Sequence, residues 1–285
     1  MTYFETTINH PFLECLECCG ENSEVNHPVK KLWYCGKIPE ARSPVVAIVG
    51  ARRSTSYGED IAYHAAYELA KRGVIIVSGM AYGIDSCAHR GCLDAGGKTI
   101  AVLGTSIDRI YPQGNHSLAR RILEKGAIIS EYAPGFPTKA YCFQMRNRII
   151  SGLSDLVLIV EAAKKSGTQG TFEYAIMQGK NVFAVPGDIT RPMSAGTNTM
   201  LKTANPYTDI SDILSAIGLR MKDDHTPDGL ADDERRVLLA MRSSHGDVGD
   251  AISKSGLSPI DFSRAMTRLE LGGHIVLKEG GWTLV

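Results

Sequence analysis

Short apolar runs alternate with longer amphipathic stretches between residue 45 and about residue 205. A continuous apolar run is typical of a strand that is buried on both faces, and several amphipathic stretches close on glycine, as helices do. This alternation predicts an α/β fold, with a doubly wound parallel sheet and helices on both of its faces. The predicted strands are 45–49, 74–77, 99–103, 127–130, 156–160 and 181–185, and the predicted helices are roughly 57–72, 84–95, 114–125, 139–151 and 169–179.

The pattern divides the chain into four parts. An N-terminal segment, 1–41, precedes an α/β domain, 42–219, in which 186–206 is rich in Pro, Gly, Ser, Thr and Asn and predicts a long loop. A polar linker follows at 220–231. The last part, 232–285, predicts three helices and a β-hairpin, an order typical of a small winged-helix domain. Its helices are expected at 233–243, 247–255 and 259–272, and its strands at 274–277 and 282–285.

Composition and charge indicate where in the cell the protein is expected and which kind of partner it binds. The 285 residues are 44% hydrophobic and 22% charged, which is typical of a globular protein. No apolar run approaches the ~20 residues that span a bilayer, and 1–10 lacks the features of a secretory signal, so we expect a cytoplasmic protein with no membrane partner. The net charge is zero, but 42–150 carries 14 Lys and Arg against 8 Asp and Glu. A polyanion is therefore an expected partner.

The seven cysteines do not indicate a disulfide framework, because their number is odd and no secretory signal precedes them. Three of them fall in predicted helices and are expected to be small buried hydrophobes. Four near the N-terminus match no tight zinc pattern, so free thiols are favoured over a metal site. The first group is Cys87, Cys92 and Cys142, and the second is Cys15, Cys18, Cys19 and Cys35.

Two glycine-containing loops follow predicted strands, where ligands of parallel sheets bind. In the first, at 50–58, Gly50 ends a strand, Arg52 can hold a phosphate and Ser54 can donate a hydroxyl, close to the free N–H groups of a helix start. The alternative is a turn with surface arginines. The second loop has Gly79 and Gly83, which allow close backbone approach. Neither matches Gly-x-Gly-x-x-Gly, so no dinucleotide cofactor is expected.

Two further segments carry phosphate-binding or base-binding side chains. The helix at 139–151 contains Phe143, a stacking platform for a base, followed by three polar residues. The alternative is a core phenylalanine beside solvated arginines. The loop at 164–173 has two lysines, two glycines and hydroxyls before a helix, which is typical of an anion-binding nest. The residues singled out are Arg146, Asn147 and Arg148 in the helix, and Lys165, Ser166, Gly167 and Thr168 in the loop.

The pair Asp85 and His89 stands four residues apart on one predicted helix face. Such a pair can act as an acid and base, but no nucleophile accompanies it. A structural pair, hydrogen-bonded side chain to side chain, is the favoured interpretation.

Several segments, in order, resemble one known family, the DNA-processing proteins DprA, also called Smf. The match covers about 170 residues. It is carried by GARRSTSYG at 50–58, SGMAYGIDSCAH at 78–89, TIAVLGTSIDRIYP at 99–112, RNRIISGLS at 146–154, VEAAKKSGT at 160–168, VFAVPG at 182–187 and GTN at 196–198.

The resemblance implies a Rossmann-like core that binds single-stranded DNA without strong sequence preference, as a homodimer. It also implies a role in natural transformation, in which the protein protects incoming strands and helps to load a RecA-type recombinase, with no catalysis, cofactor or metal. By position, the resemblance implies that Gly50, Gly79, Gly83 and Asn147 shape the DNA pocket. The residues it implies as pocket lining are Arg52, Phe143, Arg146, Arg148, Lys165, Ser166, Gly167 and Lys202.

The sequence departs from the family at two places, and the second of them suggests an enzyme as the alternative. Gln144 stands where the family usually has proline, and 167–173 differs from the usual sequence. That segment resembles the glycine-rich, glutamate-containing signature of nucleoside-monophosphate phosphoribohydrolases of a related fold. Glu173 with Arg146 would then assist cleavage of an N-glycosidic bond.

A third hypothesis is a transcription factor that uses 232–285. Residues 221–285 carry 8 Lys and Arg against 11 Asp and Glu, which opposes duplex binding, although the third helix has Arg264 and Arg268. A protein-interaction or accessory role is favoured for this domain.

Overall fold

The computed structural model describes residues 2–7, 10, 12–19, 29–40, 43–219, 230–244, 248–278 and 281–284. The chain separates into two compact units, Met1–Arg220 and Met221–Val285, and each is described here by itself. Of the predicted linker, 220–229 lies outside the described residues.

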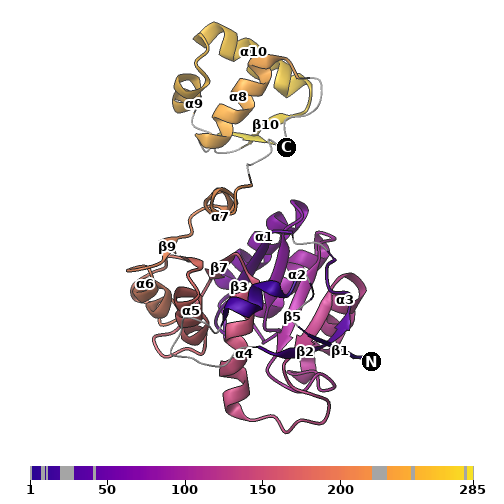
Figure 1. Cartoon of the computed structure of the whole chain (residues 1–285). Coiled ribbons are helices and arrows are strands. Elements are labelled where there is room, and N and C mark those ends of the chain that lie inside the picture. Colours follow the sequence, from indigo (N-terminus) through magenta and orange to yellow (C-terminus); the bar gives the residue numbers. More distant parts are fainter. Residues whose placement is uncertain are drawn as a thin grey trace. The chain divides into compact units, whose positions relative to one another are not determined.

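The larger unit is built on one sheet, which has nine strands within the described residues, in the order β1-β2-β6-β5-β4-β3-β7-β8-β9 (Figure 1). From β3 to β9 the chain forms parallel pairs, as the buried apolar runs predict. The strands are β1 (Phe4–Thr7), β2 (Lys31–Gly36), β3 (Val45–Val49), β4 (Ile75–Ser78), β5 (Thr99–Leu103), β6 (Ala127–Ser130), β7 (Leu156–Ile159), β8 (Asn181–Ala184) and β9 (Asn205–Pro206).

The order of the strands creates a switch point between β3 and β7. From β3 the chain builds β4, β5 and β6 outward to one side, and then returns to place β7 against the other side of β3. The connections on the two sides therefore diverge, and the carboxyl ends of β3 and β7 open a crevice. In sheets of this kind, ligands bind in that crevice.

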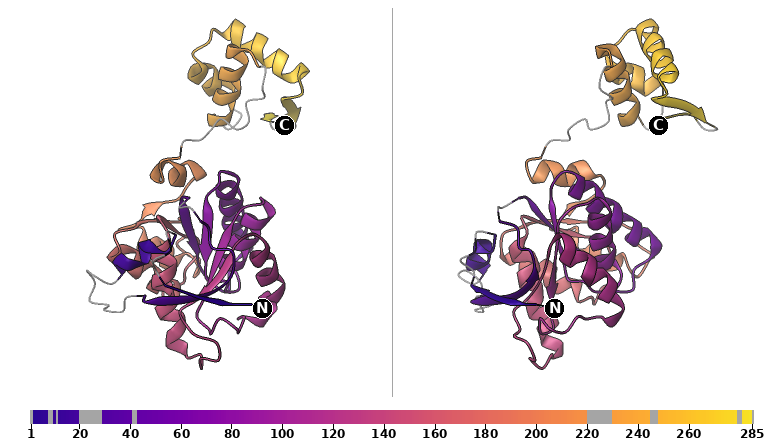
Figure 2. Two further views of the ribbon diagram at one scale, coloured as in Figure 1. Left: turned by 45° about the vertical axis from the view of Figure 1, so that its right-hand side comes forward. Right: turned by 90° about the vertical axis from the view of Figure 1, so that its right-hand side faces the viewer.

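Helices cover both faces of the sheet, which makes it the Rossmann-like, doubly wound fold. In the right-hand view of Figure 2, the purple helices α1 and α2 lie on one side of the sheet and the indigo N-terminal segment lies on the other. Hydrophobic contacts place α1, α2, α3 and α7 on the first face and η1, α4, α5 and α6 on the second. The helices are η1 (Glu14–Cys19), α1 (Ser56–Lys71), α2 (Ile84–Asp94), η2 (Gln113–Asn115), α3 (His116–Lys125), α4 (Ala140–Leu153), α5 (Thr168–Met177), α6 (Ala195–Met200) and α7 (Ile210–Ala216).

The central strand β3 explains why both faces must be covered. Its alternating residues point to opposite sides: Val45 and Ala47 pack in the core that contains α4, whereas Val46 and Ile48 pack in the core that contains α1 and α2. Every residue of β3 is buried.

Three features differ from the sequence pattern or extend it. The N-terminal segment adds β1 and β2, which pair antiparallel at the β6 edge, so the sheet is not wholly parallel. Residues 186–206 do not form one long loop, because α6 and β9 lie within them. No helix of the described chain is long and apolar enough to cross a membrane.

The cysteines lie largely as predicted. Cys87, Cys92 and Cys142 are buried in helices, which confirms that prediction. Cys35 carries a free thiol and the Cys15 thiol donates to the Phe12 carbonyl oxygen (3.5 Å), whereas the side chains of Cys18 and Cys19 lie outside the described part of the chain. Among the described residues, no group of His, Cys, Asp and Glu is arranged to hold a metal ion.

The smaller unit has its own hydrophobic core around Val237, Phe262 and Leu269. Ser258 caps its last helix by accepting a hydrogen bond from the Asp261 N–H, with proline in the first turn, as the sequence predicts. Assignment of this unit as a winged helix stays a prediction. Its elements are α8 (Asp232–Ser243), α9 (Val248–Ser255), α10 (Pro259–Leu271), and the antiparallel pair β10 (Ile275–Lys278) and β11 (Gly281–Leu284).

Candidate nucleic-acid interface

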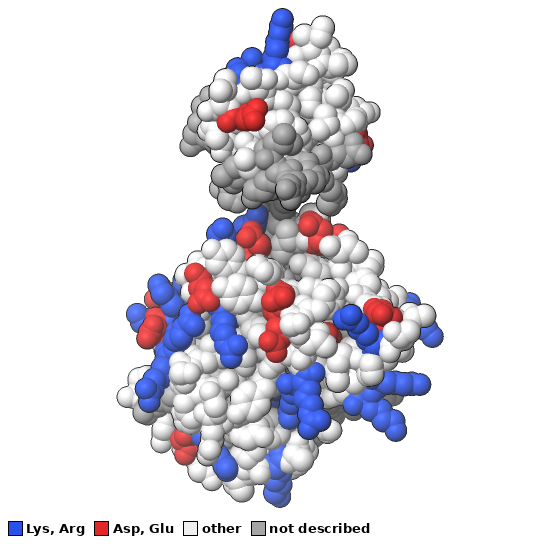
Figure 3. Space-filling model, turned by 180° about the vertical axis from the view of Figure 1, so that it is seen from behind, with Lys and Arg blue, Asp and Glu red and all other residues white. Residues whose placement is uncertain are grey.

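Surface charge alone does not locate a binding site. On the face seen in Figure 3, Lys and Arg side chains form separate groups with Asp and Glu between them, and not one continuous basic patch. The excess of basic residues in 42–150 must therefore be judged by where individual side chains converge.

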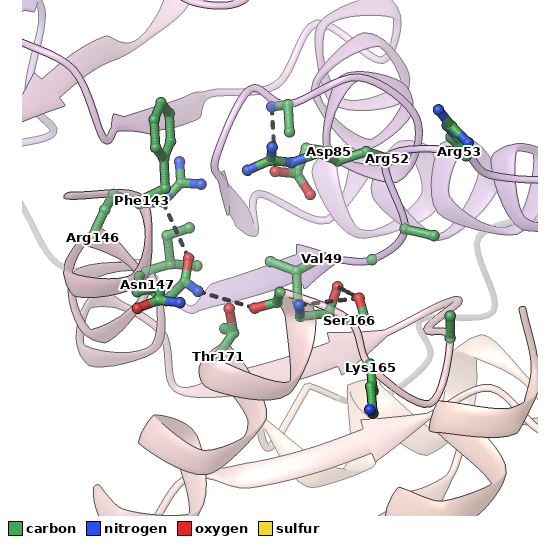
Figure 4. Close-up of a pocket in the computed structure, with 18 of the residues that line it drawn as sticks. Val49, Arg52, Arg53, Asp85, Phe143, Arg146, Asn147, Lys165, Ser166 and Thr171 are labelled. Carbon is green, nitrogen blue, oxygen red and sulfur yellow. Dashed lines mark hydrogen bonds between the residues drawn. The ribbon is translucent and has the colours of Figure 1, made fainter. Parts of the chain in front are cut away.

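They converge in a cleft of about 580 Å³ at the carboxyl ends of β3, β4 and β7, at the switch point of the sheet. Figure 4 shows Arg52 and Asp85 on one side of this cleft, Ser166 and Lys165 on another, and Val49 between them. We call it the switch-point cleft. Of the residues singled out from the sequence, it is lined by Gly50, Arg52, Phe143, Arg146, Asn147, Lys165, Ser166, Gly167 and Thr168.

The loop after β3 is held by a carboxylate from the strand next to it. Glu161, directly after β7, is buried and accepts hydrogen bonds from the Thr55 N–H (2.9 Å) and the Thr55 hydroxyl (2.6 Å). A Cβ on Gly58 would lie 2.5 Å from this carboxylate, which explains the glycine. The anion-attracting start of α1 is thus already occupied by a side chain of the protein itself.

The loop after β4 is closed in the same way. Oδ2 of Asp85 accepts hydrogen bonds from the N–H groups of Gly79 (3.2 Å) and Ala81 (3.3 Å), and burial raises the pKa of this carboxyl. Gly83 precedes α2 with φ +75°, and a Cβ there would lie 2.4 Å from the Ala51 carbonyl oxygen. These N–H groups of the loop are therefore engaged inside the protein, and the Ile84 N–H at the start of α2 donates to the Ala51 carbonyl oxygen (3.3 Å).

Asp85 does not form the predicted hydrogen bond with His89. The ring Nδ1 of His89 instead lies 2.7 Å from the Thr99 hydroxyl. Burial lowers the pKa of His89 to about 3, so the ring is neutral at physiological pH. Asp85 and His89 therefore bond to different partners, and the prediction of a hydrogen-bonded pair was wrong.

Arg146 places a positive charge in the floor of the cleft. It is 5% exposed, and its Nη1 donates to the carbonyl oxygens of Gly79 (2.8 Å) and Val102. Burial lowers its pKa to about 10, opposed by the Asp85 carboxylate, so the guanidinium stays charged at neutral pH. A Cβ on Gly79 would lie 2.3 Å from Nη1, and this close packing requires glycine.

The third helix start, that of α5, is open. Gly167 and Lys165 are exposed, and apart from the glycine and its two neighbours no atom of the described residues lies within 4 Å of a Cβ built on Gly167. The loop is fixed from below by Asn147, whose Nδ2 donates to the Gly167 carbonyl (3.2 Å), while the Ser166 hydroxyl accepts from the Thr168 N–H (3.2 Å). The Gln169 N–H also donates to the Ser166 carbonyl oxygen (3.1 Å), but among the described residues no carboxylate accepts a hydrogen bond at this helix start, which leaves its positive end to an external anion.

A cation and an aromatic ring form the remaining wall. The guanidinium carbon of Arg52 lies 5.6 Å from the centroid of the half-buried Phe143 ring, and Tyr111 packs on that ring at 5.4 Å. Gly104 permits this arrangement, since a Cβ there would lie 2.7 Å from the phenylalanine ring. An exposed cation over a ring offers a phosphate contact and a stacking surface side by side.

Five of the predicted residues do not line the cleft, and one of them, Gly79, lies under the Arg146 guanidinium, as described above. The Ser54 hydroxyl donates to Glu59 (2.7 Å), and Gly83 instead shapes the start of α2. Arg148 is buried and pairs with Glu131 (2.5 Å), because a helix turns by ~100° per residue and carries it away from the face of Arg146. Lys202 is exposed in the turn after α6.

The sequence reasoning missed two residues of the site. Glu161 orders the first loop, and its signal was a carboxylate directly after a buried strand. Arg53 also lines the cleft and is exposed beside Arg52. A run of two arginines after a strand was visible in the sequence, but only Arg52 was singled out.

The geometry does not support the hydrolase alternative. Glu173 is exposed on α5 and does not line the cleft, and the guanidinium of Arg146 is engaged by backbone carbonyls. In the sequence, Glu173 also follows Thr171 after one intervening residue, whereas the signature has two. The glutamate and arginine of that hypothesis do not meet.

Comparison with protein families shows which family this chain belongs to. The model of the family "DNA recombination-mediator protein A" matches residues 19–218, which include all of the switch-point cleft. The chain belongs to this family. Membership in the DNA recombination-mediator family confirms the resemblance inferred from the sequence motifs.

Relatives in the family support the same assignment over most of the chain. Protein Smf of Escherichia coli is 37% identical over 263 residues, covering 88% of this chain and 70% of that protein. DNA processing protein DprA of Streptococcus pneumoniae is 38% identical over 208 residues, covering 72% and 73%. A solved structure of DNA processing protein A from Helicobacter pylori, described as giving insight into a single-stranded DNA binding mode, aligns with TM-score 0.66 and 32% identity, covering 76% and 96%.

Proposed function

We propose that the switch-point cleft binds the backbone of single-stranded DNA, and that this recombination mediator protects incoming strands. The observation that carries the proposal is the convergence of three features in one cleft. These are the open start of α5 at Gly167, the exposed guanidinium of Arg52, and the half-buried ring of Phe143. The related protein of H. pylori is itself described as binding single-stranded DNA.

The ring favours a single strand over a duplex. Base faces are accessible for stacking only when a strand is unpaired, and every base has such a face. Backbone N–H groups, Arg52 and Lys165 contact phosphates without distinguishing the bases. Binding with little sequence preference is the expected consequence.

The wider role rests on family membership. We propose that the protein assists loading of a RecA-type recombinase during DNA-mediated transformation, acts as a homodimer in the cytoplasm, and catalyses no reaction. An aromatic ring and groups that bind phosphate suffice for binding DNA. Hydrolysis would require Glu173 beside Arg146, and only Arg146 lines the cleft.

A titration tests the proposed function. A fluorescent oligo-dT strand is added to the protein at ~50 mM salt, with release of adenine from AMP as the parallel assay. We expect binding that weakens steeply as salt increases, because phosphate contacts release counterions, and no release of adenine. Absence of DNA binding together with adenine release would overturn the proposal in favour of the hydrolase.

The single substitution Glu173→Ala distinguishes DNA binding from the hydrolase alternative. Because Glu173 is exposed and outside the cleft, we expect the Kd for oligo-dT to stay within about twofold of the unchanged protein. Fluorescence anisotropy measures this. A large loss of binding would show that α5 contacts DNA beyond its first turn, which the account does not allow.

Deletion of 225–285 tests the role of the smaller unit. Arg268, on its third helix, pairs with Asp233 and with Glu234 (2.6 Å), so this cation is already neutralised inside the unit. We expect the affinity for oligo-dT to be largely retained by the truncated chain, measured by the same titration after circular dichroism has verified folding. Loss of binding by a folded truncation would assign the DNA contact to the smaller unit.

A further inference from the structure

A second hollow, of about 430 Å³, lies beside the loop that follows β5. Two tyrosines, Tyr82 and Tyr111, and the side chains of Arg109 and His116 line it. The proposed phosphate contacts of the switch-point cleft do not use any of these four side chains. We call this hollow the tyrosine groove.

The tyrosine groove and the switch-point cleft share neighbouring walls. A narrow hollow of about 50 Å³ joins them and shares its lining with both. Arg52, Phe143 and Arg146 belong to this connection and to the switch-point cleft, whereas Tyr82 and Tyr111 belong to the connection and to the tyrosine groove. The path from one to the other therefore passes over aromatic rings.

The two tyrosines are held in place yet accessible. Tyr82 is 51% exposed and Tyr111 is 45% exposed. The Tyr82 hydroxyl accepts a hydrogen bond from the Gly114 N–H (3.3 Å), and the Tyr111 ring rests against Phe143 with its plane tilted by 54°. Large exposed rings that are already ordered lose little entropy when a flat ligand stacks on them.

The tyrosine groove carries one arginine and one aspartate side chain. Arg109 is exposed, and its backbone is fixed because the Thr105 hydroxyl donates to its carbonyl (2.6 Å). The carboxylate of Asp108, which also lines the groove, accepts a hydrogen bond from the Gly135 N–H (3.0 Å). Asp108 and Arg109 are both exposed, but the carboxylate is held by the neighbouring loop, so Arg109 is the group of this pair that can meet a phosphate.

We propose that a single DNA strand bound in the switch-point cleft continues into the tyrosine groove, where its next bases stack on Tyr111 and Tyr82 and a phosphate meets Arg109. The inference rests on the proposed function and extends its site. Two adjacent rings, Phe143 and Tyr111, lie between two cations, Arg52 and Arg109, so that this path offers surfaces for both the bases and the phosphates of a strand.

A length series tests this extension. Kd is measured for dT strands from about 4 to about 16 nucleotides, for the unchanged chain and for the double variant Tyr82→Leu, Tyr111→Leu. We expect the unchanged chain to gain affinity with length and the variant to lose about tenfold on the long strand, but less than about twofold on the short one. Tyr57→Leu is the matched control, since Tyr57 is 46% exposed and lines neither the cleft nor the groove.

A second readout guards against a merely structural effect. Tyr82→Phe with Tyr111→Trp keeps the rings and should restore the gain with length. In strands with one 2-aminopurine at successive positions, stacking quenches the fluorescence, and we expect the double leucine variant to lose quenching only at positions beyond the cleft.

The possible results distinguish failure of the proposed DNA binding from failure of its extension into the tyrosine groove. If the unchanged chain binds no strand of any length, the proposed function fails and the extension fails with it. If it binds short strands but gains nothing with length, or if the double leucine variant keeps the full gain, the extension alone is overturned. The tyrosine groove would then be a surface for another partner, such as a protein.

Discussion

Arg52→Ala is expected to weaken binding of an oligo-dT strand by about tenfold or more. Arg52 is an exposed cation in the cleft, it stacks over Phe143, and charge-assisted hydrogen bonds to phosphate are among the stronger ones. Losing one phosphate contact on a single strand should also reduce the slope of log K against log salt by about 0.7. Anisotropy titrations at several salt concentrations measure both quantities.

Two companion variants sharpen that experiment. Arg52→Lys keeps the charge but loses the planar guanidinium over the ring, so we expect partial recovery of affinity. Arg90→Ala removes an exposed arginine of α2 that does not line the cleft, and we expect no change. Equal weakening by Arg52→Ala and Arg90→Ala would mean that net charge, and not the cleft, binds the strand.

Arg146→Met is expected to destabilise the larger unit by about 3 kcal/mol. The side chain is 5% exposed, and its Nη1 is the donor to the Gly79 and Val102 carbonyl oxygens. Methionine fills much of the same space but donates nothing, so buried acceptors lose their partner. Urea unfolding measures the change in the free energy of unfolding.

The tryptophans allow this measurement to be confined to one unit. The chain has two, Trp33 in β2 and Trp282 in β11, so Trp33 fluorescence in a Trp282→Phe background reports on the larger unit. Arg53→Met is the matched control, an exposed arginine of the same cleft that should change stability by less than about 0.5 kcal/mol. If Arg146→Met were equally neutral, the assigned hydrogen bonds would not hold the floor of the cleft.

Much of the α/β fold could be predicted because burial on both faces leaves a simple pattern. The apolar runs 45–49, 99–103 and 127–130 match β3, β5 and β6 in full. The antiparallel strands β1 and β2 were not predicted. The edge strand β1 is mostly polar, and β2 is only partly buried, so neither has the pattern of a strand buried on both faces.

The candidate site could be predicted as a set of loops, but not as a set of contacts. Spacing showed three glycine-rich loops before helices, yet only the fold reveals that the carboxylates of Glu161 and Asp85 hold two of these loops. Likewise, Arg146 and Arg148 look equivalent in the sequence, whereas one lines the cleft and the other pairs with Glu131. Such assignments depend on tertiary partners that lie distant in the chain.

Hydrogen exchange with and without an oligo-dT strand tests the central claim most directly, because it reports where the strand contacts the backbone. The account predicts slower exchange in the loops at 50–55, 79–83 and 164–168, which surround the switch-point cleft. The cleft between α1 and α7, lined by Tyr57 and Tyr207, should exchange unchanged. Protection confined to that second cleft or to 230–284, with the three loops unaffected, would contradict the account.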